Sequence, residues 1–126
     1  MALSPQEWLR QAEYDMDTAQ AMFDAGRYFY AVFMCHLSVE KALKGVFMER
    51  LHEVPPKIHN LMSLLKRIGA TPPENIGKFM VRLNEASVVT RYPDSLESVQ
   101  RDFTAQTVPH ILAATRETLA WTRTLF

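Results

Sequence analysis

Residues 28–44 read YFYAVFMCHLSVEKALK, and this stretch decides the fold. Its first eight residues, Tyr28–Cys35, are apolar on every side of the helix that the stretch predicts. A helix without a polar face must be covered from all directions. The next three polar positions, His36, Glu40 and Lys44, recur every four residues and therefore share one face. We expect a central helix from about Tyr28 to Arg50 that carries partly buried charge.

Start and stop signals predict a helix on each side of this segment. Ser4 is a good N-cap, Pro5 suits the first helical position, and Glu7 completes a capping box. Apolar residues then follow at helical spacing until Gly26, which ends the helix. Beyond the central helix, Pro55-Pro56 breaks the chain.

Three further helical segments are expected in the second half of the chain. The first runs near residues 59–68 and is ended by Gly69. The second starts after Thr71 as its cap and ends before Pro93, because the residue preceding a proline resists helical angles. The last runs from about Thr107 to the end. No alternation long enough for a sheet appears, so we predict one all-α domain over residues 1–126, an antiparallel up-and-down bundle of four to five helices.

Composition narrows the class of protein. No apolar run is long enough to span a membrane, the N-terminal residues lack the pattern of a signal peptide, and Cys35 is the single cysteine. These features favour the cytoplasm. The net charge is zero, but residues 41–67 carry six basic and two acidic residues. This local excess either solvates helices or forms a site for an anion or an acidic partner.

The histidine and cysteine spacings predict neither a metal site nor a cofactor site. His36, His52, His59 and His110 have no zinc-like spacing, and one cysteine cannot build a structural zinc site. The four glycines are isolated, so no phosphate-binding loop is present.

Glu40 and Lys44 have the favourable orientation of an ion pair four residues apart. Because they follow an apolar stretch, we expect partial burial, which makes pairing more necessary. The pair serves either the structure or a direct contact with a ligand, and His36 is expected beside it as a hydrogen-bonding neighbour.

Two further signatures stand at helix boundaries. Lys57 and His59 follow the proline pair, where they either cap the loop or hold an anion at the start of a helix. Arg91-Tyr92-Pro93-Asp94 places a guanidinium, a phenol and a carboxylate in one turn. In a functional interpretation Arg91 clamps a phosphate, Tyr92 stacks on a base and Asp94 orients the arginine. In a structural interpretation Arg91 and Asp94 lock the turn and Tyr92 fills the core.

In their order and spacing these signatures resemble a HEPN domain, the small all-helical module of prokaryotic nucleotidyltransferase partners, toxins and ribonucleases. The resemblance covers nearly the whole chain and rests on Trp8, Asp15, Gly26-Arg27-Tyr28, Glu40-Lys41-x-x-Lys44, Lys57-x-His59-x-Leu61 and Arg91-Tyr92-Pro93-Asp94. It implies a module that binds nucleotide or RNA, dimerises, and is the partner of a minimal nucleotidyltransferase in a two-gene, toxin–antitoxin-like system. The apolar segment Tyr28–Cys35 independently favours a homodimer.

The resemblance leaves open whether the chain is an enzyme. Catalytic HEPN members are metal-independent endoribonucleases, with an arginine followed after roughly four to six residues by a histidine. Here no histidine follows Arg91 before His110, so the alternative function is an endoribonuclease with a degenerate motif. Its candidate catalytic residues are Arg91, His59 and Tyr92.

We expect the ligand in a cleft between the basic region and the Arg91 turn. The candidate ligand-binding residues are Lys44, Lys57, His59, Arg91, Tyr92 and Asp94. An antiparallel bundle can bring these two regions to the same end, and the phosphate of a nucleotide is the ligand that suits several converging cations.

Overall fold

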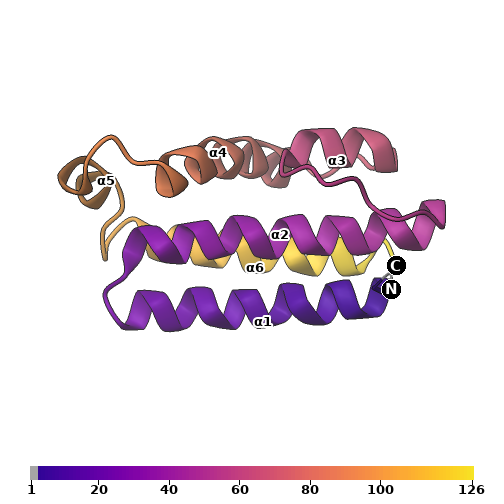
Figure 1. Ribbon diagram of the computed structural model, residues 1–126, viewed down its shortest axis with the longest axis horizontal. Helices are drawn as coiled ribbons and strands as arrows, with labels where there is room; N and C mark the ends of the chain where they lie inside the picture. The colour runs from indigo at the N-terminus through magenta and orange to yellow at the C-terminus, as the bar shows by residue number, and fades with distance from the viewer. Residues whose placement is uncertain (1–2) are drawn as a thin grey trace.

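The computed structural model describes residues 3–126, and these form six helices (Figure 1). They are α1 Pro5–Asp24, α2 Tyr28–Leu51, α3 Leu61–Ile68, α4 Glu74–Arg91, α5 Leu96–Asp102 and α6 Val108–Arg123. The described residues contain no strand, so the predicted all-α bundle is confirmed. Four helices are long, and α3 and α5 are short additions. None of the helices within residues 3–126 has the length and apolar character that crossing a membrane requires.

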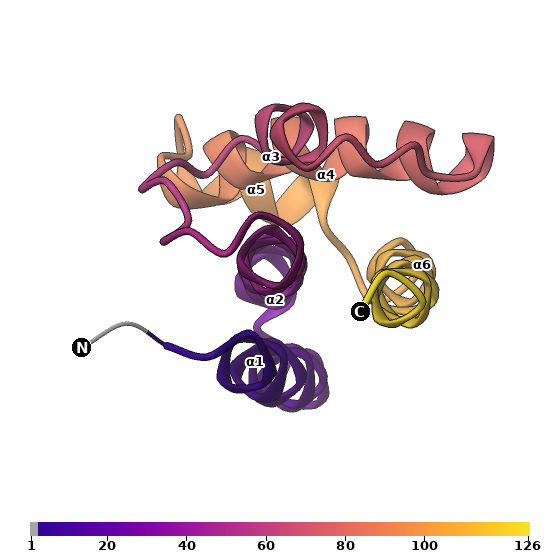
Figure 2. The ribbon, with the colours of Figure 1, turned by 90° about the vertical axis from the view of Figure 1, so that its right-hand side faces the viewer.

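Helix α2 occupies the centre of the molecule. It packs against each of the other five helices. Figure 2 looks nearly along α1, α2 and α6, with α1 and α6 on different sides of α2. Helix α4 is seen from its side in that view, so it crosses the other three obliquely. This surrounding explains why the first half of α2 has no polar face.

The burial of α2 is almost complete along its inner faces. Ala31, Val32 and Cys35 are fully buried, whereas Tyr30 keeps 51% of its surface exposed. Burial raises the pKa of the Cys35 thiol to about 11, because the thiolate would lose its hydration. Cys35 is therefore a small core residue and not a reactive thiol.

Gly45 allows α1 and the C-terminal residue to pack closely against α2. A Cβ atom at this position would lie 3.0 Å from both the Pro5 carbonyl oxygen and the Phe126 ring, and 3.2 Å from the Trp8 Cβ. Any larger residue would push α1 and the C-terminus away from α2. The start of α1 at Pro5 and the C-terminal residue Phe126 therefore lie at the same end of the bundle, both beside Gly45 (Figure 1).

The helix signals in the sequence are mostly accurate. The Ser4 hydroxyl caps α1 by accepting a hydrogen bond from the Glu7 N–H, and Gly69 ends α3 in the left-handed conformation. Two predictions are wrong. Helix α3 begins at Leu61 with Asn60 as its N-cap, so His59 lies outside it. Helix α4 begins at Glu74 after Pro73, and Thr71 is not its cap.

Candidate functional site

The buried carboxylate of Glu40, on α2, lies at the centre of a group of basic side chains. Glu40 is only 3% exposed. Its Oε2 atom lies 2.9 Å from the Lys44 Nζ, and its Oε1 atom lies 2.9 Å from the His59 Nδ1. The His36 Nδ1 is 3.9 Å from the same Oε1. The predicted Glu40–Lys44 pair is therefore present and buried, and both carboxylate oxygens have a hydrogen-bond partner.

His59 links this buried carboxylate to the surface. It stands on the connection between α2 and α3, and its side chain is 61% exposed. Because the Nδ1 atom faces a carboxylate, Nδ1 carries the proton and donates it to Glu40. In the neutral imidazole the Nε2 atom is then unprotonated. Glu40 thus fixes both the orientation and the tautomer of His59, as carboxylates do for functional histidines.

Asn84 on α4 is held by two donors. The Leu61 backbone N–H donates to its Oδ1 atom at 3.1 Å, which also satisfies an N–H group at the start of α3. A backbone N–H can only donate, so this contact fixes which end of the amide is oxygen. The His36 Nε2 approaches the same oxygen at 3.3 Å. The amide Nδ2 is left as a donor without a hydrogen bond to any other described residue.

His36 is buried and neutral near neutral pH. Burial lowers the pKa of its imidazole, against the smaller opposing effects of the Asn84 hydrogen bond and the Glu40 charge. A neutral imidazole has one N–H, and the position of Asn84 Oδ1 assigns that proton to Nε2. His36 therefore supports the orientation of Asn84 from inside the core.

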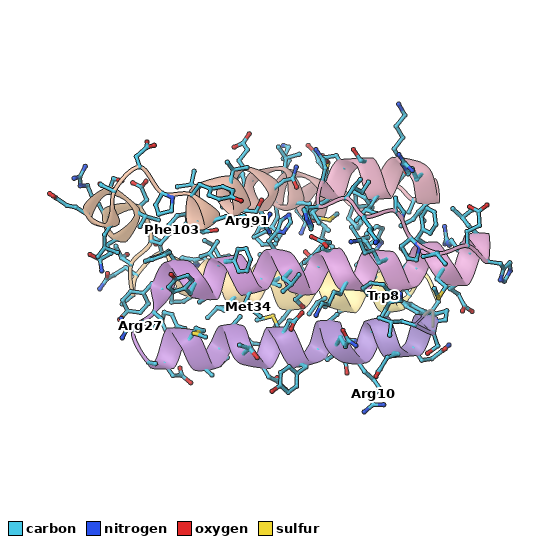
Figure 3. All side chains as sticks on the ribbon, viewed as in Figure 1. Trp8, Arg10, Arg27, Met34, Arg91 and Phe103 are labelled. Carbon is cyan, nitrogen blue, oxygen red and sulfur yellow. The ribbon has the colours of Figure 1, made fainter. Side chains whose placement is uncertain are left out.

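Arg91 is the last residue of α4, and Tyr92 is its C-cap. The helix ends here because Tyr92 precedes Pro93. The Arg91 guanidinium lies 5.1 Å from the centre of the Phe33 ring, a cation–π contact that holds it between α4 and α2. Figure 3 labels Arg91 on α4. Within residues 3–126 it forms no ion pair, with Asp94 or any other carboxylate.

These groups surround a small cavity of about 190 Å³. Its lining residues are His59, Asn60, Asn84, Ser87, Val88, Arg91 and Tyr92. None of these residues is acidic, and the ring of Tyr92 stands at the surface with 75% of the residue exposed. The cavity therefore combines a guanidinium, an imidazole and an amide donor beside an exposed aromatic ring. We call it the His59–Arg91 cavity.

The structure brings three of the six candidate ligand-binding residues together. His59, Arg91 and Tyr92 line the His59–Arg91 cavity, whereas Lys57 and Asp94 are exposed residues outside its lining. Lys44 is buried behind it as the partner of Glu40.

The sequence interpretation missed Asn84. A signal for it existed, because Asn84 precedes Arg91 by two helical turns and must share a face of α4 with it.

Two of the larger hollows, of about 480 and 460 Å³, lie elsewhere. They are lined mainly by apolar, aromatic and uncharged polar side chains. The His59–Arg91 cavity is the better candidate because functional groups converge there, although it is smaller. The part of the chain that the structure describes contains no group of three or more metal-ligating side chains suited to a metal ion.

Comparison with known proteins agrees with this architecture. The family model described as "HEPN domain" matches residues 5–125. The crystal structure of TT1696 from Thermus thermophilus is 26% identical, with a TM-score of 0.82 over 97% of this chain and 98% of that chain. The structure of ST0689, an archaeal HEPN homologue, is 23% identical, with a TM-score of 0.77 over 97% of each chain. The curated proteins include no match. Since the family model spans almost the entire chain, the protein belongs to the HEPN domain family.

Proposed function

We propose that the His59–Arg91 cavity binds a phosphate group of a nucleotide or RNA. The observation that supports this most is the convergence of Arg91, His59 and Asn84 on a cavity without a carboxylate in its lining. A guanidinium recognises phosphate oxygens through several hydrogen bonds at once. The Asn84 Nδ2 offers a further donor. The exposed Tyr92 ring provides a surface on which a base can stack.

The remaining candidate residues act around the cavity in this proposal. Lys57 stands two residues before His59 and adds positive charge to the approach. Lys44 acts indirectly, because it neutralises the Glu40 carboxylate that orients His59. Asp94, two residues beyond Tyr92, lies outside the lining, so it makes no contact with the phosphate in this proposal.

Binding of ATP and of a short RNA to the Arg91→Ala variant tests this function. Loss of a charge-assisted contact of about 1.4 kcal/mol or more weakens binding at least tenfold. Arg82→Ala is the matched control, because it removes an exposed arginine of the same helix outside the His59–Arg91 cavity. Equal binding by the wild type and the Arg91→Ala variant would refute the proposal.

The proposed assembly is a cytoplasmic homodimer that acts with a minimal nucleotidyltransferase in a two-gene, toxin–antitoxin-like system. Membership of the HEPN family supports it. Exposed apolar side chains support a surface that a second subunit covers. Several of them lie near the end of α4, not on the apolar first half of α2. They include Val88, Val89 and Leu96. Light scattering at tens of micromolar should report a dimer, and the chain should co-purify with a nucleotidyltransferase encoded by a neighbouring gene.

A second candidate function, metal-independent endoribonuclease, is favoured by the Glu40–His59 contact. In this mechanism the unprotonated His59 Nε2 takes the proton of a ribose 2′-hydroxyl, whose oxygen then attacks the adjacent phosphorus. The bond to the 5′-oxygen of the next nucleotide breaks, and that oxygen receives a proton from Tyr92 or from water. The products are a 2′,3′-cyclic phosphate and a 5′-hydroxyl, and Arg91 stabilises the charge on the pentavalent phosphate.

RNA cleavage assays separate this candidate from simple binding. Cleavage should be lost in both His59→Ala and Arg91→Ala, whereas His59→Ala should keep measurable RNA binding through Arg91. Cleavage that survives in Arg91→Ala would exclude this mechanism. Absence of cleavage in the wild type, with RNA binding retained, would assign the cavity to binding alone.

A further inference from the structure

A second, wider hollow adjoins the His59–Arg91 cavity. It has a volume of about 760 Å³, and its lining residues are Ile58, His59, Asn60, Ser63, Lys66 and Arg67. His59 and Asn60 line both spaces, so these two residues form the boundary between them. We call the wider space the α3 hollow, because Ser63, Lys66 and Arg67 belong to that helix.

The α3 hollow is lined by basic side chains, as the His59–Arg91 cavity is. Lys66 and Arg67 are exposed, and neither forms an ion pair with another residue in the described part of the chain. No acidic residue lines either space. Basic residues in the last turn also suit the helix dipole of α3. That preference accounts for their place on the helix, but it does not account for a continuous surface without carboxylates.

The volumes leave room for a ligand that extends beyond the first cavity. Pockets that enclose a whole small molecule usually measure about 300–1,000 Å³. At about 190 Å³ the His59–Arg91 cavity is below this range, whereas the adjoining α3 hollow is within it. The helical rise of about 1.5 Å per residue places Arg67 about 10 Å from Asn60 along α3. A single phosphate group is too small to contact two residues this far apart.

We propose that Lys66 and Arg67 form a second phosphate subsite and that the two spaces together bind a single-stranded nucleic acid segment rather than a mononucleotide. One phosphate lies at Arg91 and His59, and a following phosphate lies at Lys66 and Arg67. The strand is single because the exposed Tyr92 ring needs a free base face, and inside a duplex the neighbouring base pairs cover both faces. This inference rests on the proposed function, since it extends the same site.

Fluorescence anisotropy with a labelled RNA hexanucleotide, and competition by AMP, test the second subsite. The hexanucleotide should bind at least tenfold more tightly than AMP. The double variant Lys66→Ala/Arg67→Ala should weaken hexanucleotide binding at least fivefold and leave AMP binding unchanged. It should also reduce the salt dependence of hexanucleotide binding, because fewer counterions are released. The matched control, Lys78→Ala/Arg82→Ala, removes two exposed cations from α4. It should change the binding of neither the hexanucleotide nor AMP.

The outcomes distinguish this inference from the function on which it rests. If AMP binds through Arg91 but the hexanucleotide binds no more tightly, the second subsite is refuted and the phosphate site remains. If neither ligand binds, both are refuted. Tighter binding of a duplex than of the single strand also refutes the inference. A DNA hexanucleotide that binds as well as RNA supports recognition of phosphates and bases alone, and preference for RNA supports an additional contact to the ribose.

Discussion

Two buried carboxylates lie at adjacent positions of α2, since Glu40 belongs to that helix and Asp15 contacts its neighbour Lys41. They differ in what they connect. Asp15, on α1, is 6% exposed and lies 3.0 Å from the Lys41 Nζ. Glu40 is 3% exposed and is approached by Lys44, His59 and His36. Residues 40 and 41 are about 100° apart around the helix, so one carboxylate joins α2 to α1 and the other joins α2 to His59 on the connection between α2 and α3.

The two contacts differ in how they are hydrogen-bonded and in which part of the surface they reach. The Lys41 side chain is 22% exposed, and Asp15 Oδ2 has no partner with hydrogen-bond geometry. By contrast, both Glu40 oxygens are hydrogen-bonded, and one of the partners reaches the His59–Arg91 cavity. A buried carboxylate with several basic neighbours can hold a histidine in one orientation at the surface.

Removing Glu40 should have the largest effect on stability. Glu40→Ala leaves the Lys44 ammonium buried without its carboxylate, and breaking a buried ion pair in this way costs about 3–5 kcal/mol. Urea unfolding measures the loss. Glu74→Ala, which breaks an exposed pair with Lys78, is the control and should change the free energy of unfolding by less than about 1 kcal/mol. Similar small losses in both variants would contradict the importance of the Glu40 group.

Asp15→Ala should have a smaller effect, of about 1–2 kcal/mol, because the Lys41 stem can carry its ammonium into water. The ligand affinity should remain that of the wild type, since this pair contacts no residue of the His59–Arg91 cavity. Urea unfolding and nucleotide binding on the same preparation check both statements. A loss equal to that of Glu40→Ala would erase the distinction between the two carboxylates.

The pH dependence of stability tests the buried state of His36. Because burial lowers its pKa in the folded state, the unfolded chain binds this proton first as the pH falls below about 6.5. The folded state therefore loses stability as the pH falls from about 6.5 towards the folded pKa, by up to about 1.4 kcal/mol per pH unit. The charged and titratable groups that face the imidazole are Glu40, Arg91 and His59.

His36→Gln removes this titration and retains an amide donor towards Asn84. Its unfolding free energy should decline less steeply than that of the wild type between about pH 7 and about pH 5. Urea unfolding at several pH values gives the two slopes. Parallel slopes would show that His36 does not contribute to the pH dependence of stability. A steeper slope in the variant would show that the pKa of His36 is raised, not lowered, in the folded state.

The sequence predicts the helices well because their determinants are local. The apolar stretch Tyr28–Cys35 indicated a central helix, and the Ser4 and Gly69 signals agree with the observed ends of α1 and α3. The errors at His59 and Thr71 concern helix starts: the Asn60 side chain caps α3 locally, and contacts from other helices add to such local signals. Asn84, for example, accepts the Leu61 N–H and helps to set the start of α3.

The site is less predictable because its contacts join residues far apart in the chain. The Glu40–Lys44 pair follows from helical spacing, but the His59 contact depends on the path of the loop after Pro55-Pro56. The stacking of Arg91 on Phe33 depends on the crossing of α4 over α2. Sequence motifs indicated His59, Arg91 and Tyr92, yet the exclusion of Lys57 and Asp94 from the lining required coordinates.

His59→Ala should give the smallest change in stability and the clearest separation of the two roles. Glu40 retains Lys44 as its partner, and the lost hydrogen bond belongs to a side chain that is 61% exposed. The free energy of unfolding should therefore fall by less than about 1 kcal/mol. Nucleotide or RNA binding should weaken at least threefold, because the imidazole lines the cavity itself. His59→Gln retains hydrogen-bonding capacity and should recover part of the binding. If His59→Ala instead lowers stability as much as Glu40→Ala and leaves binding intact, the histidine is a structural partner of Glu40, and the contrast with the Asp15–Lys41 pair disappears.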